Sequence, residues 1–204
     1  MKKILICDFD GTLIKENIEK RLLAYLLREK KLIWYQYILA VISLPINLLR
    51  KKIGKGNLFS AWSAFLSVNK YNQLIHDFLE MEAKKITLNS EVLDYIKDFN
   101  GKKVLLTGSR LDLVKKYLLY YNQQDLFDEI IGTQTDRRGF IIKIHPYGKE
   151  KMKYIRKYNN TVGIGNEYAD RYFLKLCKEV IVVNPDDKLE QIAKKNNWKL
   201  IRCV

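Results

Sequence analysis

The sequence contains few cysteines. Its 204 residues include three, Cys7, Cys177 and Cys203, which lie far apart in the chain. Their spacing is not that of a metal site, and an odd number does not form a complete disulfide framework. Because sparse, unpaired cysteines are typical of a reducing compartment, we expect a cytoplasmic protein.

The first residues do not have the pattern of a secretory signal peptide. Lys2 and Lys3 are basic, but the apolar run that follows them is short and ends in two acidic residues. A signal peptide has a longer apolar stretch followed by small residues at a cleavage site. We therefore expect this segment to belong to the folded protein.

Acidic side chains are scarce relative to basic ones. The chain has 37 Lys and Arg residues against 23 Asp and Glu residues, so its formal net charge is +14 at pH 7. A field of this sign attracts phosphorylated small molecules, nucleic acids and anionic lipid headgroups alike. Lysines that merely solvate the surface would give the same excess, so the charge alone does not select a partner.

The apolar segments predict an α/β fold. Hydrophobic residues make up 48% of the chain, enough for one large domain or one domain with an insert. Apolar runs without polar alternation are typical of strands buried on both faces. Such runs occupy residues 4–7, 104–106, 129–132, 162–165, 180–183 and 200–201. Because helical patterns separate them, we predict a doubly wound, mainly parallel sheet.

The helices expected between these strands lie at about 90–99, 111–121, 148–158, 168–177 and 186–196. Asn89 or Ser90 can cap the first of them through a side-chain oxygen, and Gly101 follows its end. Residues 137–139, Arg-Arg-Gly, predict a hairpin turn.

An all-helical insert is predicted at residues 14–85, between two parts of the α/β core at 1–13 and 86–204. Apolar residues recur at helical spacing in segments 18–27, 59–66 and 74–81. The segment between the first two has no charged side chain from Ile33 to Leu49 and has basic residues on both sides.

This uncharged segment has two interpretations. It is shorter than the roughly 20 residues of a membrane-spanning helix and contains Pro45, so a full span is disfavoured. One interpretation is a helix buried within a small helical domain. The other is peripheral contact of residues 33–55 with an anionic membrane, with Trp34 and Tyr35 at headgroup depth and lysines on lipid phosphates.

Two acidic residues follow the first predicted strand directly, in the sequence Asp-Phe-Asp-Gly-Thr at residues 8–12. Ligands of open α/β sheets bind at the carboxyl ends of strands, where the loops form a crevice. Gly11 permits a tight turn there. Asp8 and Asp10 are therefore candidate ligand-binding residues at this edge of the sheet.

The same residues resemble the first motif of the haloacid dehalogenase superfamily, most of whose members are magnesium-dependent phosphatases. The resemblance implies a Rossmann-like core with the helical insert as a cap. It also implies that Asp8 attacks phosphorus to form an aspartyl-phosphate and that Asp10 acts as acid and base. Gly11 and Thr12 would help to bind the phosphate.

A second motif of this family is similar to Thr107-Gly108-Ser109, at the end of another predicted strand. The resemblance implies that the Thr107 hydroxyl holds a phosphoryl oxygen. A hydroxyl followed by glycine can present both its oxygen and nearby backbone amides to a phosphate. Thr-Gly-Ser is also an ordinary connection between a strand and a helix.

The third motif supplies a lysine that neutralises phosphoryl charge and orients the nucleophile. Gly148-Lys149-Glu150-Lys151 contains two candidates. The phosphoserine-phosphatase-like branch usually has Gly, two residues and then Lys, which implies Lys151, with Lys149 as the alternative.

The fourth motif resembles residues 165–170, Gly-Asn-Glu-Tyr-Ala-Asp. Family members commonly have an aspartate where this chain has Asn166, and acids here bind Mg²⁺. Because an amide oxygen brings less charge, Asp170 becomes the more important acid, and Glu167 is an additional candidate. The implied magnesium ligands are Asp8, the backbone carbonyl of Asp10, Asn166 and Asp170.

The substrate is the open question at this stage. The apolar, Pro-containing and Trp-containing insert resembles that of C-type phosphatidylglycerophosphate phosphatases, which implies a lipid phosphate. The alternative is a small soluble phosphomonoester such as phosphoserine. A more distant alternative is a non-catalytic protein that binds a polyanion; nucleic acid is disfavoured because no RNA-binding motif is present.

Overall fold

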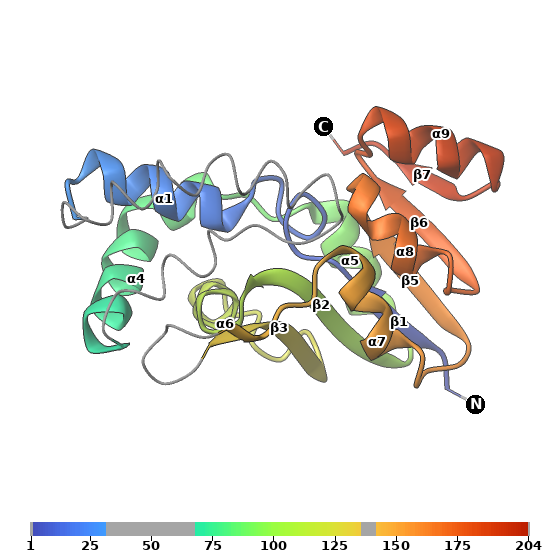
Figure 1. The fold of residues 1–204 in the computed structure, drawn as a ribbon, viewed down its shortest axis with the longest axis horizontal. Helices are drawn as coiled ribbons and strands as arrows, with labels where there is room; N and C mark the ends of the chain where they lie inside the picture. The colour runs from blue at the N-terminus through green and yellow to red at the C-terminus, as the bar shows by residue number, and fades with distance from the viewer. Residues whose placement is uncertain (1, 32–67, 136–141, 204) are drawn as a thin grey trace.

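The computed structural model of this chain describes residues 2–31, 68–135 and 142–203. They form one seven-stranded sheet in the order β4-β3-β2-β1-β5-β6-β7 (Figure 1). The strands are β1 (Ile4–Cys7), β2 (Lys102–Arg110), β3 (Glu129–Thr135), β4 (Ile142–Ile144), β5 (Thr161–Gly165), β6 (Glu179–Val183) and β7 (Lys199–Ile201). All neighbouring pairs are parallel except β3 with β4, so the predicted doubly wound, mainly parallel fold is confirmed.

The strand β1 lies at the centre of this sheet, between β2 and β5. Its last residue, Cys7, is in register with Leu105 of β2 and Ile164 of β5. The order along the sheet reverses direction at β1, because the chain passes to β2 on one side and later to β5 on the other. Such a switch point is where open α/β sheets form a ligand-binding crevice.

Helices cover both faces of the sheet. The larger apolar core contains residues of α5 (Ser90–Asp98) and α6 (Leu111–Tyr120), and the smaller one contains residues of α7 (Lys151–Ile155), α8 (Arg171–Leu174) and α9 (Asp187–Lys195). Two of the expected helices are shorter than predicted. A 3-10 turn at Gly148–Glu150 precedes α7, and another at Tyr168–Asp170 precedes α8.

The helical segments of the predicted insert that the structure describes are α1 (Ile18–Arg28), α4 (Val68–Glu82) and a 3-10 turn at Ala83–Lys85. Figure 1 shows α1 and α4 together at one end of the molecule. Tyr25 of α1 packs on Phe78 of α4, with ring centroids 5.7 Å apart. The chain leaves the core near Ile14 and returns near Leu88, and these two residues form a β-bridge.

Several predictions lie outside the described residues: the uncharged run 33–49, the helix at 59–66 and the turn at 137–139. The assignment of 14–85 as a separate cap domain therefore stays a prediction. Within the described ranges, none of the helices has the length and apolarity needed to span a bilayer.

The capping hydrogen bond predicted for Asn89 at the start of α5 is not formed. Asn89 occupies the N-cap position, but its side-chain oxygen makes no capping hydrogen bond. Its side-chain amide instead donates to the carbonyl of Thr12 at 2.7 Å, and its backbone amide donates to the carbonyl of Leu13 at 2.8 Å. The fully buried Asn89 thus ties the returning chain to the loop that follows β1.

Tyr117 of α6 also contacts the segment through which the chain returns to the core. Its buried hydroxyl donates to the carbonyl of Ile86 at 2.8 Å, and the hydroxyl of Tyr121 donates to the same oxygen at 3.0 Å.

We expect Tyr117→Phe to lower the free energy of unfolding by about 1 kcal/mol, because one of two hydrogen bonds is lost and the ring is kept. Urea unfolding should show this loss, whereas Tyr120→Phe, whose hydroxyl bonds to no described residue, should be within about 0.5 kcal/mol of wild type. Equal stability of both variants would contradict this role for Tyr117.

Candidate active site

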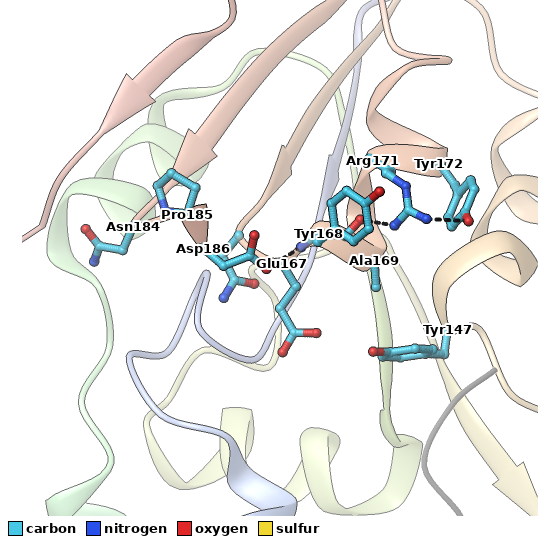
Figure 2. A pocket seen from close by; sticks show the side chains of 10 residues that line it. Tyr147, Glu167, Tyr168, Ala169, Arg171, Tyr172, Asn184, Pro185 and Asp186 are labelled. Atoms are coloured by element: carbon cyan, nitrogen blue, oxygen red, sulfur yellow. Dashed lines mark hydrogen bonds between the residues drawn. The ribbon is translucent and has the colours of Figure 1, made fainter. Parts of the chain in front are cut away.

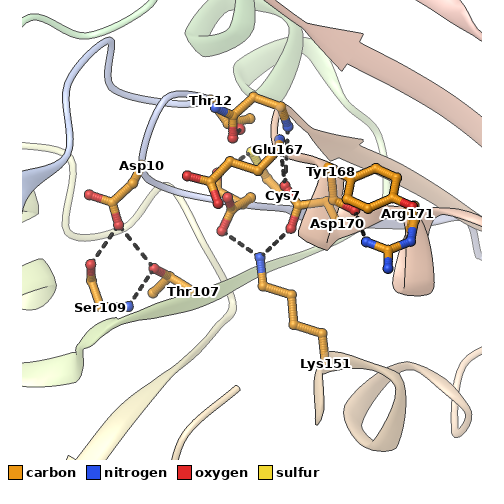
Figure 3. A network of polar contacts seen from close by, with 12 residues as sticks. Cys7, Asp10, Thr12, Thr107, Ser109, Lys151, Glu167, Tyr168, Asp170 and Arg171 are labelled. Atoms are coloured by element: carbon orange, nitrogen blue, oxygen red, sulfur yellow. Dashed lines mark hydrogen bonds and ion pairs between the residues drawn. The ribbon is translucent and has the colours of Figure 1, made fainter. Parts of the chain in front are cut away.

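Lys151 connects two acids at the carboxyl ends of the central strands. Its ammonium group lies 2.7 Å from Oδ1 of Asp8, which follows β1, and 2.8 Å from Oδ1 of Asp170, which follows β5 (Figure 3). Only 2% of Lys151 is exposed. Lys149, the alternative candidate, is instead exposed and lies over the ring of Tyr172, so the structure places Lys151 at the acids.

The charges of this group perturb one another. Burial raises the pKa of Asp8 well above its usual range, the charge of Asp170 raises it further, and Lys151 opposes both. Burial alone would lower the pKa of Lys151, but Asp170 and Asp8 outweigh it, so that pKa lies above its ordinary value. One ammonium faces two carboxylates, which favours an additional cation beside Asp8.

Asp10 is held by hydrogen bonds from the start of α1 and from the motif at the end of β2. Its Oδ1 accepts a hydrogen bond of 2.7 Å from the backbone amide of Ile18, the first residue of α1. Its Oδ2 accepts from the hydroxyl of Ser109 and, at 3.5 Å, from that of Thr107 (Figure 3). Burial raises the pKa of Asp10 although these hydrogen bonds act against it. A carboxyl with a raised pKa can carry a proton at higher pH than an ordinary aspartate.

The motif at the end of β2 is held by a hydrogen bond within it and by contact with Tyr147. Thr107 is fully buried, and its Oγ1 accepts a hydrogen bond of 3.0 Å from the amide of Ser109. Gly108 lies under Tyr147, where an added Cβ would come within 3.2 Å of the ring. These contacts bring the second predicted motif beside Asp10.

Gly11 and Thr12 shape the position of Asn166. Gly11 has a φ of +70°, and a Cβ there would lie 2.1 Å from Nδ2 of Asn166, so only glycine allows this approach. The hydroxyl of Thr12 donates to Oδ1 of Asn166 at 3.1 Å. Thr12 is fully buried, and its hydroxyl supports the side chain of Asn166.

Asp170 is extensively bound within its own loop. Its Oδ2 accepts from the backbone amides of Asn166 and Glu167, both at 3.2 Å, while its Oδ1 accepts from Lys151. The side chain of Glu167 in turn accepts from the backbone of Asp170, which completes a capping box. Both acids are therefore occupied with stabilising the loop after β5.

The donors around Asp8 suit a hard cation. The ligands that the resemblance implies are the carboxylates of Asp8 and Asp170, the backbone carbonyl of Asp10 and the side-chain oxygen of Asn166, all oxygen atoms. In the part of the chain that the structure describes, no three His, Cys, Asp or Glu residues form a metal-binding group. Mg²⁺ keeps several waters and takes only one or two protein carboxylates, so this small oxygen set fits it, whereas Zn²⁺ prefers nitrogen and sulfur ligands.

Two cavities adjoin this centre. One of about 450 Å³ is lined by Tyr147 and by residues 166–169, 171–172 and 184–186 (Figure 2). The Arg171 guanidinium lies over the rings of Tyr168 and Tyr172, at 3.5 and 3.9 Å from their centroids, and gives this cavity a stacked wall. The other, of about 340 Å³, is lined by residues 110–112, Lys115, Thr133 and Gln134.

These features define a doubly wound α/β protein with an acid pair and a buried lysine at the switch point of its sheet. The family model described as haloacid dehalogenase-like hydrolase matches residues 5–175. The chain belongs to this family of hydrolases, and the predicted family membership is confirmed.

Known proteins share the fold at low sequence identity. A structure of a protein of unknown function from Bordetella pertussis Tohama I is 14% identical, with a TM-score of 0.77 over 98% of both chains. A substrate-bound complex of phosphoserine phosphatase is 17% identical, with a TM-score of 0.58 over 98% of this chain and 93% of that one.

One sequence relative is a histidinol-phosphatase from Neisseria meningitidis serogroup C (strain 8013). It is 30% identical over 71 residues. The match covers 35% of this chain and 32% of the length of the relative.

Proposed function

We propose that this protein is a magnesium-dependent phosphatase that hydrolyses phosphomonoesters through an aspartyl-phosphate on Asp8. The observation that carries the proposal is the position of Lys151, with its ammonium 2.7 Å from Asp8 and 2.8 Å from Asp170 at the switch point of the sheet. A buried ammonium can hold a carboxylate ionised and oriented and can offset the charge of a phosphoryl group.

In the proposed first step, a carboxylate oxygen of Asp8 attacks phosphorus, and the bond from phosphorus to the ester oxygen breaks. Asp10 gives a proton to that oxygen, so the alcohol leaves neutral. Burial raises the pKa of Asp10, which favours its protonated form at this stage. Ser109 and the amide of Ile18 hold the carboxyl in position.

In the second step, Asp10 takes a proton from a water molecule, and that water attacks the phosphorus of the aspartyl-phosphate. The bond between phosphorus and Asp8 breaks, so inorganic phosphate leaves and both acids return to their starting states. Asp8, the carbonyl of Asp10 and Asn166 would hold Mg²⁺. The ion would supply positive charge that stabilises phosphoryl oxygens.

The charge of the proposed metal ligands should determine how tightly the site binds Mg²⁺. Asn166→Asp places a second carboxylate among the oxygens beside Asp8, and Thr12 can still donate to it. We expect the Mg²⁺ concentration for half-maximal phosphate release to fall about fivefold to tenfold, as an added anionic ligand strengthens binding. A titration with MgCl₂ after treatment with EDTA measures this change. Asp94→Asn, at an exposed position of α5, is the control that removes a carboxylate outside the metal set. Unchanged or weaker Mg²⁺ dependence in Asn166→Asp would contradict the proposed ligand set.

We propose two alternative classes of substrate. The names of a histidinol-phosphatase and of phosphoserine phosphatase among the similar proteins support a small soluble phosphomonoester. The net charge of +14 and the uncharged run 33–49 support a lipid phosphate such as phosphatidylglycerophosphate, with residues 33–55 touching an anionic membrane. Flotation with vesicles containing phosphatidylglycerol separates the two, because only the lipid substrate requires binding to the vesicles.

A further inference from the structure

The second motif interrupts the regular pairing of β2 with β3. The register of the two strands shifts between Leu106 and Arg110, so that residues 107–109 of β2 lie opposite Gly132 alone. A Cβ on Gly132 would come within 2.9 Å of the carbonyl oxygen of Ser109, so glycine lets β3 pass close to this bulge. Extra residues in one strand leave backbone groups without a partner in the ladder, and these groups need other partners when they are buried.

Two threonine hydroxyls bind one peptide unit of the bulge from both ends. The peptide between Gly108 and Ser109 contributes the carbonyl of the first residue and the N–H of the second. The N–H donates to Oγ1 of Thr107 at 3.0 Å, and the carbonyl accepts from Oγ1 of Thr133 at 2.5 Å. Both threonines are buried. The hydroxyl of Thr133 therefore replaces a ladder partner and fixes the orientation of this peptide plane.

His145 directs the hydroxyl of Thr133. The Nδ1 atom of the ring lies 2.7 Å from Oγ1 of Thr133. Thr133 has one hydroxyl hydrogen and donates it to the carbonyl of Gly108, which can only accept, so Oγ1 accepts from Nδ1–H of His145. Two residues further on, the ring of Tyr147 packs on Gly108 and stacks on His145, with centroids 6.1 Å apart. The segment after β4 thus holds the bulge together with β3.

These hydrogen bonds lead to the proposed proton donor, Asp10. Because the amide of Ser109 donates to Oγ1 of Thr107, the hydroxyl hydrogen of Thr107 points to another acceptor, Oδ2 of Asp10 at 3.5 Å. The hydroxyl of Ser109 donates to the same oxygen (Figure 3). A rotation of the peptide between the two hydroxyl residues would displace both hydroxyls, and a shift of about 1 Å at a reacting group can cost about a hundredfold in rate.

We infer that Thr133 and His145 are positioning residues of the proposed reaction. His145 directs the hydroxyl of Thr133, and Thr133 holds the second motif in the orientation in which its two hydroxyls face Asp10 and the phosphoryl group. Both residues act through the second motif, so their effect does not depend on the alcohol of the ester. This inference rests on the proposed phosphatase function.

Thr133→Val tests the first contact, because it replaces the hydroxyl with a methyl group of nearly the same size. With Mg²⁺, we expect kcat to fall about tenfold to a hundredfold for both ethyl phosphate and 2-aminoethyl phosphate, with KM within about threefold of wild type. The loss lies in kcat because the second motif acts on the phosphoryl group in the transition state. Thr133→Ser keeps the hydroxyl and should restore kcat to within about threefold of wild type.

The matched control is Thr161→Val in β5. Thr161 is as buried as Thr133, at 3% and 2% exposed, but it pairs with Ile4 at the start of β1, away from the acids. Its kcat should stay within about twofold of wild type, as expected for a change outside the site. Circular dichroism of each variant shows whether it is folded.

His145 is tested by two variants and a double variant. His145→Leu removes the donor and should lower kcat about threefold to tenfold, whereas the amide nitrogen of His145→Asn can replace Nδ1–H and should restore most of it. In the double variant Thr133→Val/His145→Leu, kcat should match that of Thr133→Val within about twofold, because His145 acts through the hydroxyl that is already missing.

The possible results separate this inference from the proposed function. A folded Thr133→Val variant with wild-type kcat overturns the inference alone, as does an equal loss in Thr133→Ser or in Thr161→Val. Losses that multiply in the double variant overturn the role of His145. If Thr133→Val does not fold, wild-type kcat in His145→Leu overturns the inference instead. Wild type that releases no phosphate from either ester overturns the proposed phosphatase function, and the inference with it.

Discussion

Asp8→Asn is expected to lower kcat for phosphate release by at least about 10⁴-fold, the scale seen when a catalytic nucleophile is removed. An amide cannot attack phosphorus as a carboxylate does. Its oxygen can still accept a hydrogen bond from Lys151, so the fold should be preserved. Release of inorganic phosphate from ethyl phosphate and 2-aminoethyl phosphate, with Mg²⁺ present, measures the loss.

The control for this variant is Asp94→Asn, a change of the same chemistry at an exposed position of α5. It should retain wild-type kcat within about twofold, as expected for a surface substitution away from the site. An Asp8→Asn variant with activity comparable to this control would exclude Asp8 as the nucleophile.

Lys151→Met is expected to lower the free energy of unfolding by about 3–5 kcal/mol at pH 7, in addition to removing activity. The substitution keeps most of the length of the side chain but leaves Asp8 and Asp170 buried without their cation, and breaking a buried ion pair in this way is strongly destabilising. Urea unfolding followed by circular dichroism measures the change.

The matched control is Lys153→Met, two residues along α7. Lys153 pairs with Glu150, but 69% of its side chain is exposed, so its loss should leave the stability close to that of the wild type. If both variants unfold at the same urea concentration, the buried ion pairs do not have the role assigned to them.

The Lys151→Met variant should also change how stability depends on pH. Burial raises the pKa of Asp8, and without the opposing charge of Lys151 that pKa will rise further. At Asp8 the folded state then binds more protons than the unfolded state, so the contribution of this group to stability is largest below about pH 4, the pKa of an unfolded aspartate, and is lost as the pH rises through the raised pKa. A variant whose loss relative to wild type stays the same from pH 4 to pH 7 would contradict this.

The sheet could be predicted from the sequence because its central strands are continuous apolar runs. Residues 4–7 and 162–165 are buried on both faces and lie next to each other, as that pattern requires. The helices after Gly148 and Glu167 were predicted too long, because both begin as 3-10 turns. The turn at Tyr168–Asp170 is closed by a capping box between Glu167 and Asp170, a contact that periodicity does not report.

The sequence could not choose between Lys149 and Lys151, because both follow Gly148 and both suit a helix. The choice depends on which lysine faces the sheet, and only Lys151 is directed between two acids. Thr133 gave no signal at all in the sequence. A threonine in a strand is ordinary, and its position beside the second motif depends on how β3 pairs with the irregular end of β2.

Asn89 illustrates a similar limit. Its place before α5 is typical of a capping residue, but the fold directs its amide to Thr12, a residue far away in the sequence. Local patterns thus located the elements and the four motifs, whereas contacts between distant segments decided which side chains act together.

The most direct measurement of the central claim is detection of phosphate on Asp8 during turnover. Wild-type protein is mixed with ³²P-labelled 2-aminoethyl phosphate and Mg²⁺ for a single turnover, quenched in acid and digested for peptide analysis. The mechanism predicts label that hydroxylamine removes, on the peptide containing Asp8, and none in Asp8→Asn. Release of phosphate by the wild type with no labelled peptide at any time, together with an active Asp8→Asn variant, would contradict it.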